Sequence, residues 1–135
     1  MRRADCRITW LRRDDASCIL RWMPFVTPPE MRSIEPLPGW RGRFFHSENM
    51  TFAIYDVDAD AVPIHEHQHP QEEVWNIVSG KVAVSIDGAE RILGPGEAAI
   101  VPSNAPHHAR AITSSRAIVV DYPLRLQLPG TLHSA

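Results

Sequence analysis

The segment 65–73, with the sequence HEHQHPQEE, carries three histidines at alternating positions, followed by two glutamates. Side chains two positions apart on an extended strand point to the same face, so alternating imidazoles can reach one point in space. A carboxylate that returns on the neighbouring strand, after the turn at Pro70 and Gln71, can join them. Imidazole and carboxylate ligands together suit borderline divalent ions such as iron, manganese, nickel and zinc. The segment therefore predicts a metal site.

A cluster of this kind also has a simpler explanation, which is a set of solvated histidines on an exposed loop. Regular alternation followed by acidic residues argues against it, but a further ligand from elsewhere in the chain is needed. The segment 96–107, GEAAIVPSNAPH, ends in a histidine after a turn rich in proline, and it supplies that ligand. Four of the seven histidines then belong to one short segment and one later turn.

The chain after Arg43 consists of short apolar runs separated by turn residues, and no long window has helical periodicity. Asp87 and Gly88 form a strong hairpin signal, because both residues tolerate positive φ. Seven short strands at nearly regular spacing predict an all-β sandwich or barrel. The strands are expected at 51–57, 73–79, 81–86, 90–93, 98–101, 107–112 and 116–122.

Basic residues gather in the first third of the chain: nine of fourteen precede Phe44, whereas eleven of sixteen acids follow it. A basic leader can bind nucleic acid or a membrane, but Asp5, Asp14 and Asp15 interrupt this one, so we expect neither partner. No apolar stretch follows the first arginines as in a secretory signal, and we expect a cytoplasmic protein. Residues 1–39 are predicted to be an arginine- and proline-rich extension, disordered in part or an arm, residues 40–125 the barrel, and residues 126–135 a mobile tail.

Composition is that of an ordinary soluble domain: 135 residues, 44% apolar and 22% charged, with a formal net charge of −2. The longest apolar runs, 98–101 and 117–120, are far too short to span a membrane. The only cysteines are Cys6 and Cys18, whose spacing matches no zinc or redox pattern. We expect free, reduced thiols.

Two parts of the chain resemble the two sequence motifs of the cupin superfamily. The first motif is G-x5-H-x-H-x3-E-x6-G. His67, His69, Glu73 and Gly80 match it at the correct spacings, and only Ala61 departs from it by replacing the leading glycine. Two motifs in the correct order are far more specific than one short pattern.

The second motif, G-x5-P-x-G-x2-H-x3-N, is met by Gly96, Pro102 and His107. Asn104 replaces the inner glycine, a mild change because asparagine tolerates a left-handed turn better than other side chains do. Ala111 replaces the final asparagine, which leaves the ligands untouched. The two motifs together extend the resemblance over roughly residues 40 to 125.

The resemblance implies a double-stranded β-helix, a jelly-roll barrel of the RmlC-like type, with one divalent transition metal ion (iron, manganese, nickel or zinc) inside its mouth. The family's ligands correspond here to His67, His69, Glu73 and His107. A competing register would use His65 and His67 with Glu72. Glu72 lies seven instead of six residues before Gly80, and it faces away from the barrel if Glu73 faces inward. His65 then becomes a rim residue, or one that orients the site or binds substrate.

Alternation also predicts the walls of a pocket beside the metal. Residues that share a face with Glu73 and His107 point inward, and small alanines among them leave room for a ligand. Trp75 offers a flat apolar surface for stacking, although it serves equally well as core filling. Tyr122 could contribute a hydroxyl, and its facing stays open. The candidate pocket residues are His65, Trp75, Ile77, Ala109 and Tyr122.

Three nitrogens and one oxygen leave one or two coordination positions for water or substrate, which is the mark of a catalytic metal. We therefore expect a metal-dependent enzyme acting on a small organic molecule, of the dioxygenase, cyclase, isomerase or lyase type. The fold does not select among these reactions. The alternatives are a non-catalytic small-molecule-binding or sensor cupin, and a barrel without a functional metal. We also expect a homodimer, since a partner or an N-terminal arm commonly covers exposed sheet edges.

Overall fold

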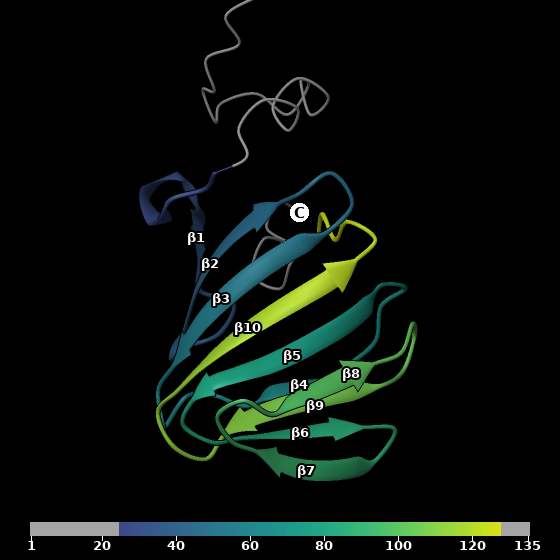
Figure 1. Ribbon diagram of the computed structural model, residues 1–135. Helices are drawn as coiled ribbons and strands as arrows, with labels where there is room; N and C mark the ends of the chain where they lie inside the picture. Colours follow the sequence, from purple (N-terminus) through teal and green to yellow (C-terminus); the bar gives the residue numbers. More distant parts are fainter. Residues whose placement is uncertain (1–24, 128–135) are drawn as a thin grey trace, which may run out of the picture.

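The computed structural model describes residues 25–127 (Figure 1). This part of the chain contains one short 3-10 helix, η1 (Pro28–Glu30), and otherwise antiparallel strands in two sheets. The prediction of an all-β jelly-roll barrel is confirmed. One sheet has six strands in the order β1-β2-β3-β10-β5-β8, and the other has four in the order β4-β9-β6-β7. The strands are β1 (Arg32–Ile34), β2 (Trp40–His46), β3 (Thr51–Val57), β4 (Ile64–His67), β5 (Glu72–Ser79), β6 (Val82–Ile86), β7 (Ala89–Leu93), β8 (Ala98–Val101), β9 (His107–Ala111) and β10 (Ser115–Tyr122).

The predicted strands agree with β3 and β5 to β10 to within one residue at each end. None of the seven expected strands corresponds to β1, β2 or β4. Gly42 weakens the strand signal of β2, because glycine in a strand has no side chain to pack. Its place in the fold explains the glycine: a Cβ there would lie 2.7 Å from the Tyr55 ring and 2.8 Å from the side chain of Ile34.

The core lies between the two sheets and is built on aromatic residues. The indole of Trp40 packs edge-on against Tyr55 and Trp75, with ring centroids 5.9 and 6.2 Å apart. Trp40 is fully buried, and its Nε1–H donates to the carbonyl of Val62 at 2.7 Å. The alternating burial along β3 and β5 turns every second side chain toward this core. The same alternation turns Glu73 inward.

Two predicted turns have the expected backbone. Asp87 and Gly88 have φ of 50° and 81° and join β6 to β7, which is the positive-φ geometry of a tight hairpin. Asn104 has φ of 61°, so it adopts the left-handed conformation that the motif's glycine would supply. These turns set the register of the four-stranded sheet and the approach to His107.

Gly80 and Gly88 both have positive φ but differ in surroundings, which makes them a matched pair. A Cβ on Gly80 would lie 2.2 Å from the carbonyl oxygen of Ser114, whereas one on Gly88 would meet nothing within 4 Å. Gly88→Ala should therefore lower the free energy of unfolding by about 1 kcal/mol, the cost of the left-handed backbone for alanine. Gly80→Ala should lower it by about 3 kcal/mol or more, because the methyl group also clashes with the Ser114 carbonyl. Urea unfolding measures both losses. Equal losses would mean that the turn at Ser114 accommodates the methyl group.

The described part of the N-terminal extension joins the larger sheet. β1 pairs with β2, and Ile34 and Leu37 pack against the core. The sheet thus begins before residue 40. Residues 1–24 and 128–135, with Cys6, Cys18 and most of the predicted leader and tail, lie outside the described residues. Within residues 25–127, no helix has the length and apolar character needed to cross a membrane. The homodimer stays a prediction, which sedimentation velocity tests.

Candidate metal centre

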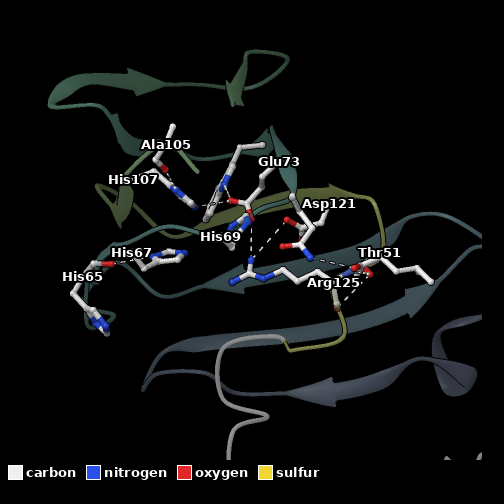
Figure 2. A network of polar contacts seen from close by, with 12 residues as sticks. Thr51, His65, His67, His69, Glu73, Ala105, His107, Asp121 and Arg125 are labelled. Atoms are coloured by element: carbon white, nitrogen blue, oxygen red, sulfur yellow. Dashed lines mark hydrogen bonds and ion pairs between the residues drawn. The ribbon is translucent and has the colours of Figure 1, made fainter. Parts of the chain in front are cut away.

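The three histidines of the predicted ligand set meet at one place between the sheets (Figure 2). His67 ends β4 and is the cross-strand partner of His107, the first residue of β9. His69 lies in the connection to β5. The ring centroids are 4.3 Å apart for His67 and His107, and 4.9 Å apart for His69 and His107. One ring nitrogen from each histidine lies within 4.8 Å of the other two, so the cluster is able to hold a metal ion.

Glu73, on β5, points its carboxylate at two of these imidazoles. Its Oε2 lies 3.2 Å from Nε2 of His69, and its Oε1 lies 3.4 Å from Nε2 of His107. The indole N–H of Trp75 donates to Oε1. The Glu73 side chain is 2% exposed, whereas Glu72 is exposed to solvent. In the structure, Glu73, the carboxylate of the register that matches the motif, therefore faces inward. Glu72, the carboxylate of the competing register, faces outward.

Backbone carbonyls orient two of the imidazoles. Nδ1 of His67 donates to the carbonyl of His65 at 3.1 Å, and Nδ1 of His107 donates to the carbonyl of Ala105 at 2.8 Å. Because a carbonyl oxygen can only accept, each Nδ1 carries the proton, and the lone pair of a neutral ring is on Nε2. This is the arrangement by which proteins fix the tautomer of a metal-binding histidine.

Buried polar atoms without a hydrogen-bond partner are rare in folded proteins, and this cluster contains several. Among the described residues, both ring nitrogens of His69 and Nε2 of His107 are buried and make no hydrogen bond. The two Nε2 atoms lie close enough to Glu73 for an ion pair but make no hydrogen bond to it. One metal ion would satisfy one ring nitrogen of His69 and Nε2 of His107, and imidazole nitrogens with one carboxylate form a donor set that suits a divalent transition metal. The residues present thus fit the ion that the motif implies.

The protonation of the cluster follows from burial and from the charge of Glu73. Burial acts to raise the pKa of Glu73, but His107, His69, Asp121 and the charge of Arg125 outweigh it, so the pKa lies well below the usual value. Burial lowers the pKa of His67. Burial also acts to lower the pKa of His107, but the carboxylate of Glu73 and the carbonyl of Ala105 raise it overall. Glu73 is therefore ionised and His67 neutral at neutral pH.

Two ionisable residues of the site were not predicted from the sequence, Asp121 and Arg125. Nη1 of Arg125 donates to Oε2 of Glu73 at 3.0 Å and lies 3.7 Å from Oδ1 of Asp121. The side chain of Arg125 is 10% exposed and that of Asp121 is 1% exposed. Burial and the charge of Glu73 raise the pKa of Asp121 to about 8. The buried network thus joins one arginine to two carboxyl groups.

The inward position of Asp121 had a signal in the sequence. Within the predicted strand 116–122, the apolar residues Ala117 and Val119 share a face with Asp121, so alternation places a carboxyl group in the core. Arg125 had no such signal, because it follows the last strand. Its backbone N–H donates to Oγ1 of Thr51 at 2.9 Å, a contact between residues 74 positions apart.

Thr51 also contacts His46, whose Nδ1 lies 2.8 Å from Oγ1. Burial, with a smaller contribution from the charge of Arg32, lowers the pKa of His46, so the folded state favours the neutral ring. The contribution of neutral His46 to the stability of the folded state is complete above the unfolded pKa of about 6.5. It is lost as the pH falls through the lowered pKa of the folded state, because the unfolded chain binds the proton more readily. Between about pH 7 and about pH 5, His46→Asn should therefore lose less thermal stability than the wild type. Parallel melting-temperature profiles would contradict this assignment.

A small cavity lies beside the ligands, with room for about 20 Å³, roughly one water molecule. Trp75 lines it. Ile77 and Ala109 are buried but belong to the core and not to the cavity wall. The cavity is lined by Ala53, Tyr55, Ile64, His67, Glu73, Trp75, Val119, Asp121 and Arg125.

Two of the predicted pocket residues lie elsewhere. Tyr122 is 57% exposed and follows the inward Asp121 on β10, so its hydroxyl does not reach the cavity. The His65 side chain is exposed and points away from the cluster in Figure 2, and the residue contributes only its carbonyl. Two larger hollows of about 510 and 520 Å³ lie away from the histidines. Asp56 lines both, and its ion-pair partner Arg116 lines the second.

Comparison with known proteins agrees with this fold. Residues 53–123, more than half of the chain, match the family model for the cupin domain, and the chain belongs to the cupin family. The fold is similar to that of an RmlC-like cupin from Shewanella frigidimarina, with 21% identity, 77% of this chain and 94% of that chain covered, and a TM-score of 0.70.

Two further solved structures share the fold. KdgF from Halomonas sp. has 25% identity, with 75% of this chain and 95% of that chain covered, and a TM-score of 0.68. The iron(II) form of HppE has 16% identity, with 76% of this chain and 62% of that chain covered, and a TM-score of 0.66. No curated protein sequence matches the chain.

Proposed function

We propose that this cupin binds one divalent transition metal ion through His67, His69, Glu73 and His107 and uses it as an enzyme on a small organic molecule. The observation that carries the proposal is the set of buried imidazole nitrogens without hydrogen bonds around an ionised carboxylate. A purely structural core has no reason to bury them, because each unpaired polar atom costs free energy. Iron, manganese, nickel and zinc all suit three nitrogens and one oxygen.

The metal, when bound, would supply Lewis-acid or redox chemistry to a ligand in an open coordination position. The residues of the chain orient the side chains around that position. Carbonyl contacts orient two imidazoles, and Trp75 holds one oxygen of Glu73 by a hydrogen bond. The apolar walls of the cavity exclude bulk water, which strengthens electrostatic interactions within it. Dioxygenase, cyclase, isomerase and lyase reactions are all compatible with such a site.

The test is the metal content of protein purified without oxygen, for the wild type and for His67→Ala and His107→Ala. We expect close to one ion per wild-type chain and a loss of at least about tenfold in each variant. His65→Ala is the matched control, because it removes an exposed imidazole and keeps the carbonyl that orients His67. Loss of metal in the control would favour the competing register, which uses His65 and not His69.

Two other results would count against the proposal. Equal metal content in the wild type and both ligand variants would reject the site. A protein that purifies without metal and gains no thermal stability from any divalent ion would be a barrel without a functional metal. With metal present, oxygen uptake with diketones and catechols tests the dioxygenase reaction, whereas a metal-loaded protein inactive on all candidates favours a binding or sensor role.

A further inference from the structure

A row of apolar side chains crosses the outer face of the six-stranded sheet from β2 to β8. Phe45 on β2 lies opposite Phe52 on β3, and their rings stack with centroids 5.1 Å apart. Val120 on β10 lies between Phe52 and Val74 of β5, as the cross-strand partner of both. Val74 in turn lies opposite Ile100 on the edge strand β8, and Ile100 is 64% exposed. Each of the five alternates with a buried core residue, so the row faces away from the metal site.

The outer faces of the two sheets differ in character. On the larger sheet a second, shorter apolar row runs beside the first, because Ile54 of β3 lies opposite Ile118 of β10. The outer face of the four-stranded sheet instead carries His108 and Arg110, which alternate with inward residues of β9, and Arg110 pairs with Glu90 at 3.0 Å. Antiparallel sheets commonly cover a core with one face and turn polar side chains to water on the other. The smaller sheet follows this rule, and the larger sheet does not.

The size of this outer face suits an interface with another protein. Within residues 25–127, every strand belongs to one of the two sheets (Figure 1), so no strand covers the face. Five strands about 4.8 Å apart, over seven residues with a rise of about 3.3 Å each, cover roughly 500 Å² before the relief of the side chains is counted. The largest apolar patch of a soluble monomer is commonly of this size, and it is often an interaction site. A standard interface covers about 800 Å² on each partner, with an apolar core and a polar rim. The two rows would form the core.

The charges on the face favour a second copy of this chain as the partner. Three arginines and three acids lie on the face or at its ends, and their charges cancel: Arg41, Arg43, Arg116, Asp56, Asp58 and Glu72. Two ion pairs are already formed within the chain, Arg116 with Asp56 at 2.7 Å and Arg41 with Asp58 at 2.9 Å. A nucleic acid or a strongly charged protein would require a surplus of one sign, which this face lacks. A copy related by a twofold axis presents the same residues, and apolar rows without a net charge beside them are complementary to themselves.

From these observations we propose that two copies of this chain associate through the outer faces of their six-stranded sheets, with Phe52, Val74 and Val120 at the centre of the interface. The proposal does not depend on the metal site. The two are nevertheless neighbours in the sheet, because Val74 lies between Glu73 and Trp75 in β5 and faces the opposite way. The partner would thus pack behind the strand that carries the proposed ligand carboxylate, without entering the site.

The test is sedimentation velocity of the full chain from about 1 to about 100 μM, a range in which a homodimer of moderate affinity dissociates. We expect the wild type to be dimeric at the upper end of this range. Ile100→Glu should raise the dissociation constant by at least about tenfold, because each copy then buries a charge in the interface. Ile92→Glu is the matched control: it makes the same change on the outer face of the other sheet, where Ile92 is 56% exposed. This control should dimerise as the wild type does.

A second variant, Val120→Lys, places a charge at the centre of the row and should abolish the dimer. Its circular dichroism spectrum shows whether it folds, and if it does not, Ile100→Glu alone decides. Three results overturn the proposal: a wild type that stays monomeric over the whole range, a dimer that both Ile100→Glu and Val120→Lys retain, or a dimer that Ile92→Glu weakens as much as Ile100→Glu does. A monomeric wild type would assign the face to another occupant, such as residues 1–24 of the same chain.

Discussion

Glutamine in place of Glu73 should reduce the affinity for divalent metal by at least about 100-fold, because Glu73 is the only charged member of the proposed ligand set. Glutamine keeps the shape and can still accept from Arg125, but it leaves the guanidinium without its closest anion. Asp121 lies 3.7 Å away and takes over part of that pairing. We therefore expect a loss of about 2 to 3 kcal/mol in the free energy of unfolding of the metal-free protein.

Calorimetric titration with zinc and urea unfolding measure the two effects of Glu73→Gln. Glu72→Gln is the matched control, because it makes the same chemical change one residue away on a side chain that faces solvent. We expect the control to bind zinc and unfold like the wild type. A Glu73→Gln variant with wild-type zinc affinity would show that the carboxylate is no ligand.

Methionine in place of Arg125 should destabilise the metal-free protein by about 3 to 5 kcal/mol, because it leaves the charge of Glu73 buried without a cation. Added zinc should recover much of this loss, since the ion provides positive charge beside Glu73. The measurement is urea unfolding of the variant and the wild type, once with a chelator and once with excess zinc. Arg116→Met removes an exposed ion pair and should lose about 1 kcal/mol or less in either condition.

The double variant Glu73→Gln, Arg125→Met measures the interaction energy between the two side chains. If the two side chains act as one unit, the double variant loses less stability than the sum of the single variants. The same loss for Arg125→Met with and without zinc would contradict the view that metal and arginine stabilise the same carboxylate. Additive losses would contradict direct coupling between Glu73 and Arg125.

The part of the site that could be predicted from the sequence depends on local geometry. Alternation along a strand has a period of two, so the inward position of Glu73 and the outward position of Glu72 follow from the spacing to Gly80. The left-handed turn at Asn104 follows from residue type. The family motifs set the order of the proposed ligands. The structure brings the three histidines together and places the Glu73 carboxylate 3.2 Å from Nε2 of His69 and 3.4 Å from Nε2 of His107.

The rest of the site depends on the path of the chain through space. Arg125 reaches Glu73 because Thr51, at the start of β3, accepts its backbone N–H. No local pattern encodes a contact over that separation. For Tyr122, by contrast, the local pattern was sufficient. Alternation with the inward Asp121 already turns the Tyr122 side chain outward, so it was a poor choice of pocket residue. β2 was missed because Gly42 weakens a strand pattern that tertiary packing requires.

The attachment of the chain after β10 has a consequence for how ligands enter and leave. Within the described residues, few hydrogen bonds hold this segment to the sheet. Two join Thr51 to the backbone of Arg125, one joins the side chain of Arg125 to Glu73, and one joins the side chain of Gln71 to the carbonyl of Leu124. A segment tied by so few contacts can detach at a much lower free energy than the barrel unfolds. We therefore expect the proposed metal ion to exchange through this local opening while every strand stays paired.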